Sequence, residues 1–137
     1  MNSGDLNSVV SELRAAGGDT AGIEVKSAAG GLPASLTSTL SALANLPGGG
    51  LIILGLDERR GFQPVPLANP QALKQGLAAK ARSFKPPVQL SIEDGTVDGA
   101  LVITAILASR IVFKEQVTKQ HLQAIAVGLL AIVMLSV

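Results

Sequence analysis

The spacing of apolar residues along the first hundred positions changes several times, and each spacing predicts a different element. Apolar residues three or four positions apart over 6–13 predict a helix, which Gly17 and Gly18 end. The stretch 22–27 alternates apolar and charged residues, which is typical of a strand with one face in water. A second helical stripe runs over 36–43, and Pro33 is expected to be the first residue of that helix.

The pattern beyond residue 50 predicts further strands. The continuous apolar run 51–56 predicts a strand buried on both faces, at the centre of a sheet. Asn69 caps and Pro70 opens a third helix, with apolar positions continuing to residue 81. Alternation over 88–92 and the apolar run 101–107 predict a hairpin, with its tip at either of two Asp-Gly pairs. We therefore expect one α+β (mixed α/β) domain over residues 1–108.

Residues 109–137 follow a different pattern. Basic residues come first, and the stretch 124–135 is apolar throughout, which is short of the roughly 18 residues of a membrane-spanning helix. We expect an apolar helix that is buried on the sheet or against another chain, with a truncation product as the alternative. The polar residues 1–5 do not resemble a signal peptide. The expected location is cytoplasmic, without a membrane partner.

Composition excludes several classes of function. The 137 residues contain no cysteine and one histidine, which excludes a disulfide scaffold, a thiolate metal site and a two-histidine relay. Eleven basic and ten acidic residues give a net charge of +1, so any binding of nucleic acid by this domain is expected to be weak. Aromatic residues make up 2% of the chain, which excludes recognition by stacking bases on aromatic rings.

Two charged segments could carry chemistry. Glu24 and Lys26 lie two residues apart on one face of a predicted strand, with Asp19 five residues upstream of Glu24. They could bind a phosphate or a metal ion, or form a weak surface ion pair. The turn Asp57-Glu58-Arg59-Arg60-Gly61 follows the central strand, where ligands often bind in α/β sheets, or it is an ordinary charged turn.

Two further segments could approach a phosphate. The turn Asn45-Leu46-Pro47-Gly48-Gly49-Gly50 lacks the Lys-Ser/Thr of a P-loop, and the end of a helix explains it equally well. The second is a run of basic residues without an acidic neighbour between Gln71 and Ile92. It forms either a set of phosphate contacts or a solvated helix face, and consists of Lys74, Lys80, Arg82 and Lys85.

Three segments in order resemble the AlbA_2 domain, also called the Schlafen AlbA_2 or divergent AAA-4 domain. They are Ile23-Glu24-Val25-Lys26, then 39–50 with Asn45 and the glycines Gly48 and Gly49, then 51–57 with Gly55. The resemblance covers about residues 6–108. Val25 stands where the family usually has Phe, and the family continues beyond residue 109 with strand, aromatic and arginine residues that this chain lacks.

The resemblance implies a nucleic-acid-binding domain of a transcriptional regulator, with DNA preferred over RNA. The backbone contacts would be Lys26, Arg59, Arg60, Lys80, Arg82 and Lys85. Some relatives cleave RNA with clustered acidic residues, which would correspond here to Asp19, Glu24 and Asp57. In that case Mg²⁺ or Mn²⁺ would be the cofactor, whereas binding alone requires none. The third possibility is an assembly module, and in each case we expect a homo-oligomer.

Overall fold

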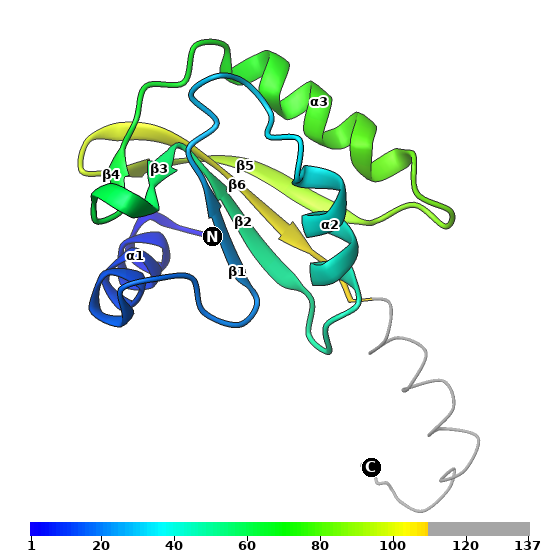
Figure 1. Ribbon diagram of the computed structural model, residues 1–137, viewed down its shortest axis with the longest axis horizontal. Helices are drawn as coiled ribbons and strands as arrows, with labels where there is room; N and C mark the ends of the chain where they lie inside the picture. Colours follow the sequence, from blue (N-terminus) through cyan, green and yellow to red (C-terminus); the bar gives the residue numbers. More distant parts are fainter. Residues whose placement is uncertain (110–137) are drawn as a thin grey trace, which may run out of the picture.

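The computed structural model describes residues 1–109, and within them three α-helices surround a mixed sheet (Figure 1). The helices are α1 (Ser3–Ala16), α2 (Leu36–Ala44) and α3 (Pro70–Arg82). The main strands are β1 (Ile23–Lys26), β2 (Gly50–Leu54), β5 (Leu90–Val97) and β6 (Ala100–Leu107). A small hairpin of β3 (Leu56–Asp57) and β4 (Gln63–Pro64) encloses a short 3₁₀ helix, η1 (Glu58–Arg60). The α+β class expected from the sequence is confirmed.

The four main strands form one sheet in the order β1-β2-β6-β5. Strands β1 and β2 are parallel, and α2 forms the crossover between them. The other two neighbouring pairs are antiparallel, and Leu51 of β2 lies opposite Ile106 of β6. The expected central strand, β2, is indeed an inner strand, and Ile52, Ile53 and Leu54 are fully buried.

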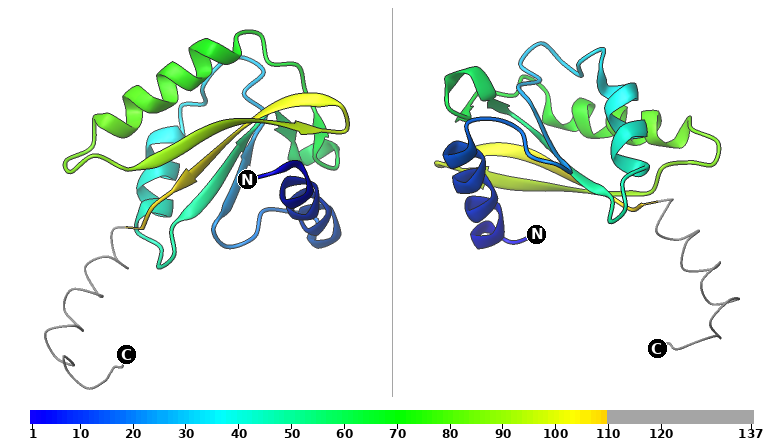
Figure 2. Two further views of the ribbon diagram at one scale, coloured as in Figure 1. Left: turned by 180° about the vertical axis from the view of Figure 1, so that it is seen from behind. Right: turned by 60° about the horizontal axis from the view of Figure 1, so that its bottom comes forward.

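The sheet separates two hydrophobic cores. Helix α1 covers one face, while α2 and α3 cover the other (Figure 2). Successive side chains of a strand point to opposite faces, so Ile53 joins the α1 core and Ile52 joins the α2/α3 core. Both faces of the inner strands are therefore buried, which explains their continuous apolar sequence.

Capping interactions set the ends of the helices, and those at Gly17, Asn69 and Pro70 are the ones that the sequence predicts. The Asn2 side chain accepts a hydrogen bond from the Asp5 N–H at the start of α1, and Gly17 ends this helix with φ of 78°. The Asn69 side chain accepts from the Ala72 N–H, with Pro70 at the first turn of α3. Helix α2 differs from expectation, because it begins at Leu36 and Pro33 lies in the turn before it.

The apolar run 51–56 is not one strand, which corrects the prediction. Gly55 adopts φ of 114° and separates β2 from β3, although its N–H still donates to the Lys26 carbonyl at 2.9 Å. The hairpin tip is Asp98-Gly99, where both residues have positive φ, as in a type I′ turn. The other Asp-Gly pair, Asp94-Gly95, lies inside β5.

Arg14 connects three parts of the α1 face. Its guanidinium donates to the carbonyl oxygens of Gly61 and Phe62 at 3.0 and 3.1 Å, and it pairs with Asp98 at 2.8 Å. The end of α1, the turn after η1 and the hairpin tip are thereby held together. Within residues 1–109 no helix is long and apolar enough to cross a membrane. The predicted apolar helix of the tail lies outside the described residues, because 110–137 are not among them.

Candidate functional site

Strand β1 presents Glu24 and Lys26 on the same face, as alternation predicts. The Lys26 ammonium lies 3.3 Å from the Glu24 carboxylate, and the two side chains are 21% and 32% exposed. The pair is therefore the weak, partly solvated ion pair that the sequence allowed, and it contributes at most about 1 kcal/mol. It stands at the edge of the sheet, because β1 is the last strand on this side.

Asp19 joins this pair from the turn after α1. Its carboxyl group shares a hydrogen bond with the Glu24 side chain and accepts another from the Val25 N–H. Partial burial of the carboxyl group raises the pKa of Asp19 to about 6. The charge and hydrogen bond of Glu24 and the charge of Glu58 also raise this pKa, whereas the Val25 N–H lowers it. Two of the three predicted acids thus lie side by side.

The third predicted acid, Asp57, caps a helix and does not join the other two. Its carboxylate accepts a hydrogen bond from the Arg59 N–H at 3.0 Å and so caps η1. The neighbouring Glu58 faces the Asp19 turn instead, since a Cβ placed on Gly18 would lie 3.4 Å from its carboxylate oxygen. Among residues 1–109 no three acidic or histidine side chains are arranged to hold a metal ion. The structure therefore does not bring Asp19, Glu24 and Asp57 together as a set.

The raised pKa of Asp19 predicts how stability depends on pH. Between about pH 4 and pH 6 the folded chain keeps a proton that the unfolded chain releases, so the free energy of unfolding falls as pH rises through this window. We expect a change on the order of 1 kcal/mol or less, because solvent screens this group. Asp19→Asn, which imitates the protonated acid, should flatten this part of the profile.

Urea unfolding of both chains at half-unit steps of pH measures this effect, and the difference between the two profiles cancels the other carboxylates. Identical slopes for the two chains between these pH values would contradict it.

The six predicted basic contacts divide into two groups. The η1 basic group consists of Lys26, at the end of β1, and Arg59 and Arg60 of η1, which follows the strand β3 that contacts β1. The α3 basic group, Lys80, Arg82 and Lys85, lies at the end of α3 and just beyond it. Figure 1 places the two groups at opposite ends of the domain. They do not form one continuous patch.

The two basic groups differ in their acidic surroundings. Arg59 and Arg60 follow directly after Asp57 and Glu58, and the Glu58 carboxylate reaches the Asp19 turn. No acidic residue lies in the chain between Gln71 and Ile92, so the α3 basic group has no such neighbour in sequence. Lys74 is set apart from it, because its ammonium pairs with Asp94 at 3.0 Å. The α3 basic group is therefore the more strongly positive one.

The glycine-rich turn 45–50 serves the packing of the sheet. Asn45 ends α2, and Gly48 and Gly49 have φ of 94° and 74°. A Cβ on Gly49 would overlap the Leu107 carbonyl oxygen, and one on Gly50 would lie 2.8 Å from the Leu43 side chain. The turn needs glycine because β6 and α2 approach it closely. Of the two sequence interpretations, this favours the end of a helix over a phosphate loop.

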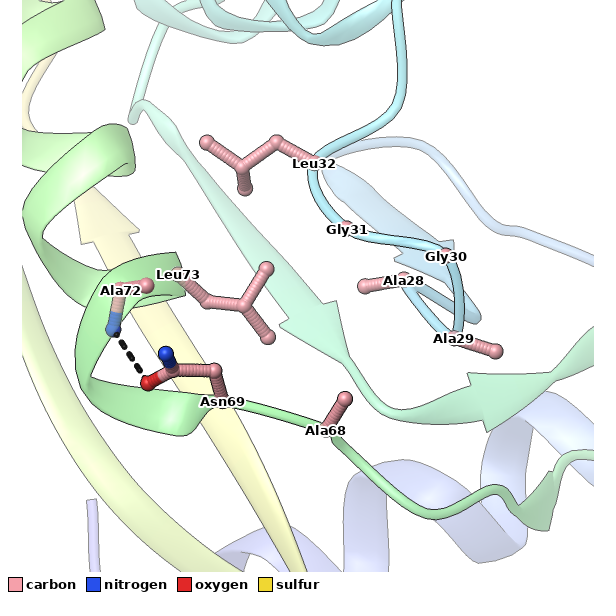
Figure 3. A pocket seen from close by; sticks show the side chains of 9 residues that line it. All are labelled: Ala28, Ala29, Gly30, Gly31, Leu32, Ala68, Asn69, Ala72 and Leu73. Atoms are coloured by element: carbon pink, nitrogen blue, oxygen red, sulfur yellow. Dashed lines mark hydrogen bonds between the residues drawn. The ribbon is translucent and has the colours of Figure 1, made fainter.

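A cavity of about 490 Å³ lies beyond the ends of β1 and β2, and sequence reasoning did not identify it. The loop after β1 forms one wall and the start of α3 the other (Figure 3). Its only polar side chain is Asn69, whose oxygen is already used to cap α3 at 3.1 Å. The remaining lining residues are Ala28, Ala29, Gly30, Gly31, Leu32, Ala68, Ala72 and Leu73. No titratable group lines it, so it offers no acid–base chemistry.

Comparison with known proteins supports the fold. No family model matches the chain, and no curated protein matches it significantly. A solution NMR structure matches with a TM-score of 0.61 and 26% sequence identity, covering 75% of this chain and 72% of that chain. It is the N-terminal domain of a "Putative ATP-dependent DNA Helicase RecG-related Protein" from Nitrosomonas europaea. The class is thus a mixed α+β domain similar to one in a DNA-helicase-related protein.

Proposed function

We propose that this chain is an AlbA_2-like domain that binds nucleic acid, with DNA preferred, as part of a cytoplasmic regulator. Two observations support the proposal. The similar solved structure belongs to a protein named for DNA. In addition, Arg59, Arg60 and the α3 basic group are exposed and form no ion pair within residues 1–109.

The α3 basic group is the main contact in this proposal. Cationic side chains without acidic neighbours attract phosphates and release the counterions that surround them. Lys80, Arg82 and Lys85 meet this description, whereas Arg59 and Arg60 share their surroundings with several carboxylates. Basic residues at the end of a helix also stabilise its negative pole, so the experiment must separate binding from stability.

A salt titration of binding tests the proposal. Wild-type chain should bind labelled duplex DNA with an affinity that falls steeply as salt rises. Changing Lys80, Arg82 and Lys85 together to Ala should weaken binding and reduce the slope of log K against log salt by about 2 to 3. Arg59→Ala/Arg60→Ala should reduce it less.

Lys74→Ala provides the matched control, because it removes a cation that is already paired with Asp94. Its slope should stay close to that of the wild-type chain. If Lys74→Ala reduced the slope by one third as much as the triple variant, each lost charge would have the same effect. Net charge, and not this particular surface, would then determine binding. The absence of any salt-sensitive shift with wild-type chain would refute the binding proposal.

A metal-dependent ribonuclease is the second candidate, and one observation favours it. Asp19 and Glu24 share a hydrogen bond beside Lys26, so two carboxyl groups and a cation already stand together. Bound Mg²⁺ or Mn²⁺ would supply an activated water, and these two carboxyl groups would be its protein ligands. The same binding reactions, repeated with tRNA and Mn²⁺, decide between the candidates. Cleavage that Glu24→Gln abolishes would establish the nuclease.

We also propose that the chain forms a homo-oligomer. The support is geometric, since strand edges are surfaces through which sheets associate. The strand that serves this role is identified next.

A further inference from the structure

Strand β5 is a long edge of the sheet, and within residues 1–109 its outward backbone groups are free. It has eight residues and pairs on one side only, with β6. A two-residue type I′ turn makes Val97 and Ala100 a hydrogen-bonded pair. Hydrogen-bonded and non-hydrogen-bonded pairs then alternate along the hairpin. The Ala108 N–H donates to the Gln89 carbonyl at 3.0 Å, in agreement with this alternation. The outward N–H and C=O groups are therefore those of Leu90, Ile92, Asp94 and Thr96.

No hydrogen bond of residues 1–109 uses these outward backbone groups. The opposite edge differs, because the outward N–H groups of β1 are bonded within its own chain. The Leu51 and Gly55 N–H groups donate to Gly22 and Lys26, so Ile23 and Val25 point away from β2. The Ile23 N–H donates to the Thr20 carbonyl at 3.0 Å, and the Val25 N–H donates to the Asp19 carboxyl group. Within residues 1–109, β5 is thus the edge whose outward N–H and C=O groups both lack partners.

The charges of β5 are neutralised within the chain. Glu93 pairs with the N-terminal ammonium of Met1 at 3.0 Å, and Asp94 pairs with Lys74 at 3.0 Å. Charged side chains normally protect an edge strand against pairing with another strand. Here each charge has a partner from α3 or from the segment before α1, so this protection is reduced.

We propose that β5 pairs antiparallel with β5 of a second copy of this chain, across a two-fold axis at Ile92, so that the two sheets become one. In such a pairing, the residue on the two-fold axis lies opposite its own copy. A register centred at Glu93 therefore places two glutamates opposite each other, and a register centred at Asp94 places two aspartates opposite each other. Like charges directly opposite are destabilising. The register centred at Ile92 instead places Ser91 opposite Glu93 and Leu90 opposite Asp94. It forms six backbone hydrogen bonds over residues 90–94.

This pairing also buries apolar surface and limits the assembly. Leu90 and Ile92 are only partly buried against the α2/α3 core, and a second strand beside β5 covers them further. Because a two-fold interface uses the β5 edge of both copies, association through this edge stops at two copies. The pairing names the surface of the oligomer proposed above and does not depend on nucleic acid, so failure of either proposal leaves the other standing.

Proline at an outward position tests the pairing directly. Asp94→Pro removes an N–H that points away from β6, so the hairpin keeps its own hydrogen bonds. Sedimentation of the full chain over a range of concentrations should show a wild-type dimer, whose dissociation constant rises at least about tenfold in Asp94→Pro. Asp94→Ala is the matched control, since it loses the same ion pair but keeps the N–H, and it should dimerise within about twofold of wild type.

A cross-link test does not depend on the stability of the proline variant. The chain has no cysteine, so Ser91→Cys/Glu93→Cys introduces the only two thiols. These positions oppose each other between copies at the shorter spacing of a non-hydrogen-bonded pair. Mild oxidation should give a covalent dimer from the double variant and not from Ser91→Cys alone. A wild-type chain that stays monomeric, an Asp94→Pro dimer as tight as wild type, or no covalent dimer would each overturn the proposal.

Discussion

Gly49→Ala is expected to lower the free energy of unfolding by about 4 kcal/mol or more, enough to unfold a domain of marginal stability. Gly49 has φ of 74°, which costs any other residue about 1–2 kcal/mol. A methyl group there would also overlap the Leu107 carbonyl oxygen and lie 3.2 Å from the Ser109 nitrogen. Both obstacles are backbone atoms, which cannot move aside as a flexible side chain can.

Gly48→Ala is the matched control for this prediction. Gly48 also has positive φ, of 94°, but a Cβ placed on it has no neighbour within 4 Å. It should therefore cost only the conformational part, about 1–2 kcal/mol. Urea unfolding measures both variants, provided that their m-values agree with that of the wild-type chain. Equal losses for the two alanines would show that β6 does not approach the turn as closely as described.

Phe62→Ala should have the second largest effect, a loss of about 3–5 kcal/mol. Phe62 is fully buried in the α1 core at 1% exposure, with Arg14 bonded to its carbonyl oxygen. The residue has φ of 60°, a strained conformation for a side chain of this size.

This strain predicts an unusual order of substitutions. Glycine normally costs about 1 kcal/mol more than alanine, because it loses more backbone freedom on folding. At position 62 glycine also relieves the left-handed strain, so Phe62→Gly should be at least as stable as Phe62→Ala. Thermal or urea unfolding of the two variants decides this order. A Phe62→Gly chain that is clearly the less stable of the two would mean that the backbone is not strained there.

Much of the fold can be predicted from residues that act locally. Capping by Asn69, the stop at Gly17 and the alternation of β1 are confirmed, because each depends on neighbours within a few positions. The sequence does not decide the tip of the hairpin, since Asp94-Gly95 and Asp98-Gly99 look alike. The structure separates them by a distant contact: a Cβ on Gly95 would lie 2.6 Å from the Leu6 side chain. Gly95 thus makes room for α1 rather than for a turn.

The candidate site could be predicted only in part, for a similar reason. The meeting of Asp19 with Glu24 follows from a short turn that leads into β1. Which of Asp57 and Glu58 faces that pair depends on η1, where Asp57 is the cap. Asp is a favoured N-cap residue, so the position of Asp57 before Glu58 and Arg59 is a signal in the sequence that points to this cap. The separation of the two basic groups is a property of the tertiary structure, and no spacing along the chain reveals it.

The position of β6 has a consequence for the synthesis of the chain. β6 is the last described strand along the chain, yet it lies inside the sheet, between β2 and β5. Once the ribosome has synthesised β1 and β2, these two strands can pair with each other. The other edge of β2 has no partner until β6, which ends at Leu107, has been synthesised. During that interval the apolar residues of β2 have no cover from β6. The sheet is therefore completed only once β6 has been synthesised, and until then the free edge of β2 is exposed to association with other chains.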